Sequence, residues 1–192
     1  MKRLILIACL VIWAIPNVAQ EVTDRKAVQV QLDVLGFAQS GFGIVGGYLY
    51  GQNRVDFDLL TNTLFDSFIN GSQDFKDFVS ERRSVMSINY YRYLNKEQVG
   101  FYYGGGLSYY EYIIEHNDLN ETQTKNAYKP GFYIGYDFLP FKNSGFYIDI
   151  WLGGRWHWEG EEQLPFSNGQ YYKIPNLDAP LGMIKFGWRF DR

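Results

Sequence analysis

One stretch of the sequence, from Gly145 to Trp158, constrains the fold more than any other. Its even-numbered positions are almost all apolar: Phe146, Ile148, Ile150, Leu152, Trp156 and Trp158. Its odd-numbered positions carry charges and rings: Tyr147, Asp149, Trp151, Arg155 and His157. Because successive side chains of a β-strand point to opposite faces, this stretch predicts a strand with one apolar face and one charged face.

Turn residues divide the chain into eight candidate strands, most of which show this alternation. The predicted strands are Ala27–Leu35, Gly41–Tyr50, Arg54–Thr61, Arg83–Leu94, Val99–His116, Pro130–Leu139, Gly145–Trp158 and Leu181–Phe190. Short connections (51–53, 95–98 and 140–144) alternate with long polar ones (62–82, 117–129 and 159–180), apart from the short first connection, 36–40. This alternation is typical of bacterial outer-membrane barrels, whose short turns face the periplasm and whose long loops lie outside. We therefore predict an all-β fold, an eight-stranded antiparallel up-and-down transmembrane β-barrel.

The cost of placing charges in lipid decides which face of each strand looks inward. An Arg or Lys that points to lipid at the bilayer midplane costs roughly 2–4 kcal/mol. The predicted inward face holds five acids and four bases: Asp33, Asp56, Asp58, Asp137, Asp149, Arg54, Arg155, Lys185 and Arg189. An eight-stranded barrel is only wide enough for side chains to fill it. The sequence therefore predicts a lumen closed by ion pairs, with no wide pore.

The first twenty residues predict export. Lys2 and Arg3 precede an apolar run from Leu4 to Ile15, and small residues follow it, so 1–20 is predicted to be a signal peptide and 21–192 the barrel domain. Leu6 to Cys9 resembles a lipoprotein cleavage site, but it leaves too short an apolar core before Cys9. Without residues 1–20 the chain has 16 basic and 21 acidic residues, a net charge of −5 that argues against nucleic-acid binding, and no cysteine.

A soluble barrel is the alternative fold. A periplasmic carrier of the lipocalin type is also eight-stranded and up-and-down, but it needs an apolar interior for its ligand and a polar exterior. The charged residues on the small interior face argue against it.

The complete pattern resembles the small eight-stranded outer-membrane β-barrels of Gram-negative bacteria, the OmpA/OmpX-like type. The resemblance rests on the signal peptide, the alternating strands and the closing run from Ile184 to Phe190, and it covers the whole exported chain. It implies a location in the cell outer membrane, contact with outer-membrane lipid, and insertion by the barrel-assembly machinery. Family members usually end on an aromatic residue, whereas this chain adds Asp191 and Arg192. The resemblance does not imply one activity, and a structural or surface-interaction role is the first hypothesis.

A membrane-embedded lipid-modifying hydrolase or acyltransferase is the second functional hypothesis. His116 and His157 are the only histidines, and Ser108 shares the inward face with His116 but lies well below it on the same strand. A Ser-His mechanism needs the two within hydrogen-bond reach, so we predict no enzyme and no catalytic residue.

Two acidic groups are weaker candidates for further sites. His157, Glu159, Glu161 and Glu162 match no established metal-binding spacing, and a solvated acidic loop explains them better. Asp56 and Asp58 lie on one face beside Arg54, which indicates ion pairing rather than acid–base catalysis. We therefore predict no metal and no cofactor.

One long loop could contact a partner. The segment 62–82 carries Phe65, Phe68, Phe75 and Phe78 among polar residues. Exposed aromatic side chains at a loop tip can mark a binding surface, so the segment 62–82 is the predicted contact site for a surface partner.

Overall fold

The computed structural model describes residues 26–33, 41–64, 78–116, 118–141, 144–159, 162–174 and 176–191. These residues form ten strands: β1 Lys26–Asp33, β2 Phe42–Tyr50, β3 Asn53–Leu64, β4 Phe78–Tyr93, β5 Gly100–His116, β6 Thr122–Phe138, β7 Phe146–Trp156, β8 Glu162–Pro165, β9 Tyr171–Ile174 and β10 Leu177–Asp191. No helix within these ranges is long and apolar enough to cross a membrane. The predicted signal peptide, 1–20, lies outside the described residues and stays a prediction.

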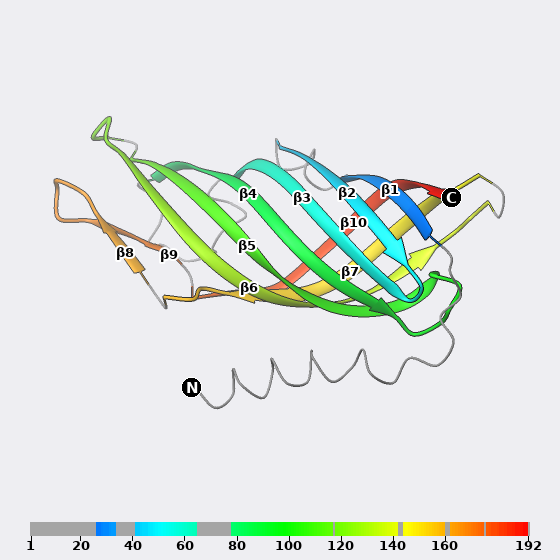
Figure 1. The fold of residues 1–192 in the computed structure, drawn as a ribbon. Coiled ribbons are helices and arrows are strands. Elements are labelled where there is room, and N and C mark those ends of the chain that lie inside the picture. Colours follow the sequence, from blue (N-terminus) through cyan, green and yellow to red (C-terminus); the bar gives the residue numbers. More distant parts are fainter. Residues whose placement is uncertain are drawn as a thin grey trace, which may run out of the picture.

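Eight of these strands close into one antiparallel barrel in the order β1-β10-β7-β6-β5-β4-β3-β2 (Figure 1). Closure is made by β1 and β10, whose register runs from Ala27 opposite Asp191 to Asp33 opposite Lys185. The other neighbours in the barrel are consecutive strands, except that β7 pairs with β10. The two strands between them in sequence, β8 and β9, form a separate two-stranded sheet. The predicted eight-stranded up-and-down barrel is therefore confirmed.

Four predicted strand boundaries at the long-loop end were wrong by three residues or more. β3 ends at Leu64 rather than Thr61, β4 begins at Phe78 rather than Arg83, β6 at Thr122 rather than Pro130, and β10 at Leu177 rather than Leu181. The added part of β6 pairs with β5 as far as Thr122 opposite Glu115, so most of the predicted loop 117–129 is strand. Along this added part both faces of β6 carry polar residues, so the apolar–polar alternation that marks a strand disappears from the sequence.

The predicted loop 159–180 contains the hairpin of β8 and β9. The two strands pair from Glu162 opposite Ile174 to Pro165 opposite Tyr171. Each strand is four residues long, shorter than the run of alternating residues needed to recognise a strand. In Figure 1 the hairpin lies at the left-hand end of the barrel, and the short turns and the C-terminus lie at the right-hand end.

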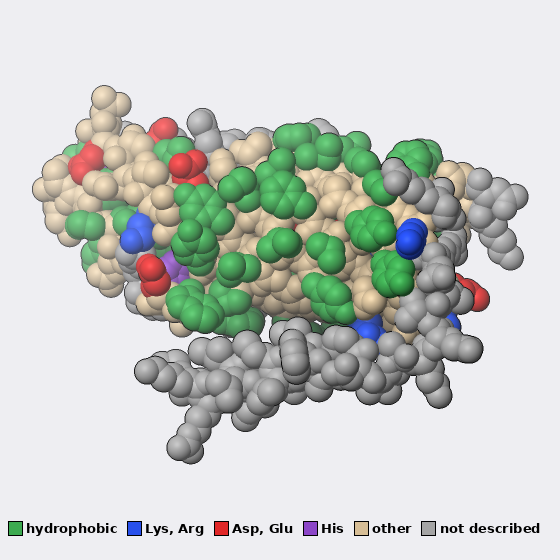
Figure 2. Space-filling model, in the orientation of Figure 1, with side chains coloured by type: hydrophobic (Ala, Val, Ile, Leu, Met, Phe, Trp, Pro, Cys, Tyr) green, Lys and Arg blue, Asp and Glu red, His purple; other side chains and the backbone are tan. Residues whose placement is uncertain are grey.

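The strand faces are oriented as predicted, with apolar side chains outside and charges inside. On β7, Ile150 and Leu152 are 46% and 57% exposed, whereas Asp149 is fully buried. Figure 2 shows apolar side chains over the middle of the barrel, with acidic and basic side chains toward its two ends. We call this exposed apolar zone the apolar belt; it includes Val30, Leu32, Val55, Phe57, Ile88, Phe101, Leu107, Phe132, Ile134, Ile150, Leu152, Ile184 and Phe186.

Tyrosine rings fill much of the interior between the charges. The buried aromatic side chains of the lumen are Tyr91, Tyr93, Tyr102, Tyr110, Tyr112, Tyr133, Tyr147 and Trp151. Some of these rings fit because a glycine faces them: a Cβ on Gly187 would lie 2.5 Å from Cζ of Tyr147. Gly187 is the register partner of Tyr147 on the neighbouring strand, so the ring can lie over a position that has no side chain.

Candidate functional site

The first candidate site is a network of charged side chains in the lumen, centred on Arg54 of β3. Its Nε lies 2.9 Å from Asp56 Oδ2, its Nη2 2.9 Å from Asp149 Oδ2, and its Nη1 3.4 Å from Asp137 Oδ2. Nη1 also donates to the Tyr93 hydroxyl at 3.0 Å. All of these side chains are buried, and buried charges require such partners. Three carboxylates from β3, β6 and β7 therefore converge on one guanidinium.

A second guanidinium extends this network to the short-turn end. Arg189 of β10 lies 2.9 Å from Asp137 Oδ2, and its Nη1 donates to the backbone carbonyl of Gln98 at 2.6 Å. Gln98 lies in the turn between β4 and β5, with a φ of 58°, and its amide donates to the carbonyl of Gly51 at 2.6 Å. Arg189 thereby connects the ionic network to a turn that closes over this end of the barrel.

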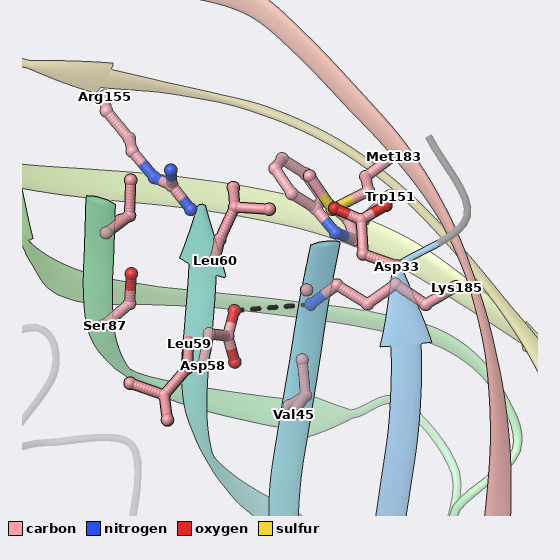
Figure 3. Close-up of a pocket in the computed structure, with 12 residues that line it drawn as sticks. Asp33, Val45, Asp58, Leu59, Leu60, Ser87, Trp151, Arg155, Met183 and Lys185 are labelled. Atoms are coloured by element: carbon pink, nitrogen blue, oxygen red, sulfur yellow. Dashed lines mark hydrogen bonds and ion pairs between the residues drawn. The ribbon is translucent and has the colours of Figure 1, made fainter. Parts of the chain in front are cut away.

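Nearer the long-loop end the lumen holds a separate ion pair. Lys185 Nζ lies 3.3 Å from Asp58 Oδ2 (Figure 3). Asn89 Nδ2 donates to the same oxygen at 3.2 Å. Asp56 and Asp58 share one face of β3, as predicted, but they pair with different cations. Beside this pair is a small cavity, in which the centre of a water molecule can occupy a volume of about 20 Å³. That is room for about one water molecule.

Two further buried cations are surrounded by aromatic rings. Arg155 of β7 donates to the hydroxyls of Tyr133 and Tyr110. Lys129 of β6 is fully buried, with its Nζ 5.1 Å and 5.3 Å from the ring centroids of Tyr110 and Tyr112. The sequence prediction missed Lys129 because it assigned this residue to a loop. The available signal was that Lys129 lies two residues before Gly131, which is on the inward face of β6, so a strand that continued past Pro130 would also point Lys129 inward.

The structure does not assemble a serine hydrolase from the candidate residues. The Ser87 hydroxyl donates to the Ser108 hydroxyl at 2.8 Å, and Ser108 is fully buried. His116 lies eight residues further along β5, a distance of about 27 Å along an extended strand. His157 is also buried, and its backbone N–H donates to the Asn176 carbonyl at 2.7 Å. Within the described ranges, no hydrogen bond joins Ser108 to either histidine.

The described residues of the candidate metal site around His157 do not form a metal-binding cluster either. Glu159 is exposed, whereas His157 beside it is 3% exposed, and Glu161 lies outside the described residues. Within the described ranges, no group of three or more His, Cys, Asp or Glu side chains is placed to hold a metal ion.

The second candidate site is the hairpin of β8 and β9 at the long-loop end. Leu164, Phe166, Tyr172 and Ile174 of the hairpin form one buried cluster with Val85, Tyr110, Tyr112, Ile114 and Ala127 of β4, β5 and β6. The inward face of the extended strands therefore continues beyond the lumen as a wall on which the hairpin packs. This apolar cluster makes the hairpin part of the folded domain rather than a free loop.

Polar contacts fasten the tip of the hairpin to the end of β5. The backbone N–H of Ser167 donates to Glu121 Oε2 at 3.0 Å, and this bond lowers the pKa of Glu121 below its usual range. The ring of His116 accepts the Asp118 N–H on Nδ1 at 3.1 Å, which leaves the proton on Nε2, hydrogen-bonded to Gln170 Oε1. His116 is thus a structural contact of the hairpin tip.

The aromatic loop is still a candidate surface site. Both of its ends are strand, because β3 continues to Leu64 and β4 starts at Phe78. Phe65, Phe68 and Phe75 lie outside the described residues, so a partner at the segment 62–82 stays a prediction.

No protein-family model and no curated protein matches the sequence. Among solved structures, the chain is similar to a major outer membrane protein from Thermus thermophilus, with a TM-score of 0.52 at 11% identity over 86% of this chain and 99% of that one. Neisserial surface protein A (NspA) matches with a TM-score of 0.43 at 10% identity, over 89% of this chain and 99% of that one. With the closed order of its own eight strands, the first likeness identifies the fold as the small outer-membrane-type β-barrel.

Proposed function

We propose that this chain is a small outer-membrane β-barrel protein of a Gram-negative bacterium, with a structural or surface-interaction role. The observation that carries the proposal is the inverted distribution of side chains. Apolar residues such as Phe132 and Ile134, each 54% exposed, ring the outside, while Arg54 and Asp149 are fully buried. An apolar surface of this extent is covered by lipid or protein in a stable molecule. The predicted signal peptide supports export to that membrane.

We further propose that the lumen is closed and that the protein conducts no ions through a wide pore. The ionic network around Arg54 and Arg189 fills the short-turn half, and the tyrosine rings fill the space between the charges. The cavity near Lys185 has room for about one water molecule. These features support a barrel that acts as a rigid scaffold for its outer end.

The outer end is the part that we propose to contact the surroundings. There the strands β4, β5 and β6 extend beyond the apolar belt and carry the packed hairpin. The segment 62–82 joins two strands, β3 and β4, so a partner bound there would also meet the hairpin end of the wall. We expect no catalysis, because Ser108 is fully buried and, among the described residues, is hydrogen-bonded to Ser87 and to neither histidine.

A soluble lipocalin-like carrier is the alternative, and the interior opposes it. Such a carrier needs an apolar chamber, whereas this lumen holds Arg54, Asp56, Asp137 and Asp149 in mutual contact.

Two measurements on the exported chain, folded into phospholipid vesicles, test the proposal. A closed transmembrane barrel is expected to stay with the vesicles and to migrate differently on SDS gels before and after boiling. In planar bilayers it is expected to show no porin-like conductance steps. Recovery of the folded protein in the soluble fraction would contradict the membrane assignment. Stable conductance steps would contradict the closed lumen and leave the membrane assignment intact.

A further inference from the structure

A row of polar and basic side chains crosses the outer surface of the barrel at the short-turn end. Strand register places Lys26 of β1 opposite Tyr50 of β2, Tyr50 opposite Asn53 of β3, and Asn53 opposite Arg92 of β4. We call these four residues the basic row. Four neighbouring strands spaced about 4.8 Å apart give the row a length of about 14 Å.

The basic row lies directly against the edge of the apolar belt. Two residues further into the barrel, the same register aligns Val28, Tyr48, Val55 and Tyr90, which belong to the same outward face. Three of these, Tyr48, Val55 and Tyr90, are between 36% and 47% exposed. Because side chains two apart on a strand share a face, the basic row also points away from the lumen. In the proposed membrane orientation it meets the lipid headgroups of the leaflet next to the short turns.

Local contacts support the basic row without neutralising it. Lys26 Nζ lies 5.7 Å from the centroid of the Tyr50 ring, and Arg92 Nη2 donates to Gln52 Oε1 at 3.5 Å. The Tyr90 hydroxyl donates to Asn53 Oδ1 at 2.6 Å. Lys26 is exposed and Arg92 half-buried, and neither forms an ion pair with a carboxylate within the described residues. Both cations can therefore still bind an anion from outside the chain.

On the barrel strands themselves, the outward-facing charged side chains differ in sign between the two ends. On the described outward faces of the barrel strands, the basic residues Lys26 and Arg92 lie at the short-turn end, and the acidic residues Glu111 and Glu115 lie on β5 toward the long-loop end. The apolar belt lies between them.

We propose that the basic row binds the phosphate diester headgroups of anionic phospholipids in the leaflet next to the short turns. The inference rests on the proposed membrane location. Arg92 can pair with two phosphate oxygens and Lys26 acts as a point charge, while the Tyr50 hydroxyl offers a further donor. A zwitterionic lipid brings its own ammonium group, which competes with Lys26 and Arg92 for the phosphate. A lipid with net negative charge is therefore favoured.

The test compares lipids retained by the folded barrel. The exported chain is folded in mixed micelles of phosphatidylglycerol and phosphatidylcholine, and native mass spectrometry measures the ratio of the two lipids that stay bound. The wild type is expected to retain phosphatidylglycerol preferentially. The double variant K26Q/R92Q is expected to lose this preference by about 10- to 30-fold, since each basic group near an anionic lipid surface contributes a factor of roughly five.

A matched control removes two positive charges from the opposite end. The variant K125Q/K173Q changes net charge equally but lies at the hairpin end, so it is expected to keep the preference. The swap K26R/R92K is expected to keep most of it. Equal retention of the two lipids by the wild type, or an equal loss in both double variants, would overturn the lipid site. If no variant shows the heat-dependent gel shift of a folded barrel, the proposed membrane function fails instead.

Discussion

Arg54 shows how much of the interior depends on a single residue. Its guanidinium lies 4.4 Å and 4.7 Å from the ring centroids of Tyr91 and Tyr102, and three carboxylates contact its nitrogen atoms. The rings shield the group from water while the carboxylates replace its hydration. Removing the cation would leave Asp56 and Asp149 buried without the ion pair that the structure gives them.

The variant Arg54→Met is expected to destabilise the folded barrel by about 3–5 kcal/mol, because uncompensated buried charges cost more than an intact pair contributes. Urea-dependent unfolding in phospholipid vesicles measures the loss. In vesicles of phosphatidylcholine, which contain no lipid with net negative charge for Arg92 to bind, Arg92→Met serves as the control, since it makes the same chemical change at a partly exposed site and should stay within about 0.5 kcal/mol of the wild type. Equal stability losses in the two variants would contradict a structural role for the network.

The sequence predicts which residues face inward, but not which of them pair. Alternation along β3 places Arg54, Asp56 and Asp58 on one face, and the structure confirms it. The partners depend on reach across the lumen: Asp58 meets Lys185 of β10, which is 127 positions away in the chain. Nothing local in the sequence encodes such a contact, so the pairing scheme required the closed barrel.

At the scale of the elements, prediction succeeded inside the apolar belt and failed beyond it. Within the belt each strand has an apolar outer face and a polar inner face, so apolar and polar residues alternate along it. Beyond it β6 continues through Pro130, which alone would end most predicted strands. The structure tolerates this proline because the ladder between β6 and β7 ends at Gly131, so Pro130 lies at the end of that ladder.

The hairpin of β8 and β9 was missed for a different reason. Its buried side chains alternate, with Leu164 and Phe166 on one side of its turn and Tyr172 and Ile174 on the other. Two residues on each side are too few to distinguish a strand from a loop by periodicity. The apolar wall of β5 that covers them is visible only when the strand extension is known.

The variant Phe166→Ala is expected to loosen the hairpin, because Phe166 is 5% exposed within the shared apolar cluster and its ring lies 5.5 Å from that of His116. Large-to-small changes in a packed cluster cost about 3–5 kcal/mol. Amide hydrogen exchange across 162–174 is expected to speed up while the barrel strands stay protected. Tyr171→Ala is the control, since Tyr171 is 53% exposed on the outer side of the hairpin. If both variants exchange at the wild-type rate, the cluster does not hold the hairpin.

For the whole molecule, the decisive property is which environment meets the apolar belt. The same backbone could in principle serve a soluble barrel, because the strand order alone does not distinguish lipid from water. What distinguishes them is the cost of a charge on the outer surface. In water an added exposed charge is harmless, whereas in a bilayer the cost depends on depth: roughly 2–4 kcal/mol for Arg at the midplane and about 0–1 kcal/mol near the interfaces.

The variants Ile150→Arg and Leu94→Arg test whether the cost of an outward-facing charge depends on its depth. Ile150 lies mid-way along β7 in the apolar belt and is 46% exposed, and Leu94 lies at the short-turn end and is 67% exposed. In vesicles, Ile150→Arg is expected to lower the free energy of unfolding by about 2–4 kcal/mol and Leu94→Arg by less than about 1 kcal/mol. Denaturant titration of both variants beside the wild type measures the difference. A soluble barrel would show no such depth dependence, because water would solvate both arginine side chains. Equal free energies of unfolding for the two variants would therefore contradict the membrane assignment.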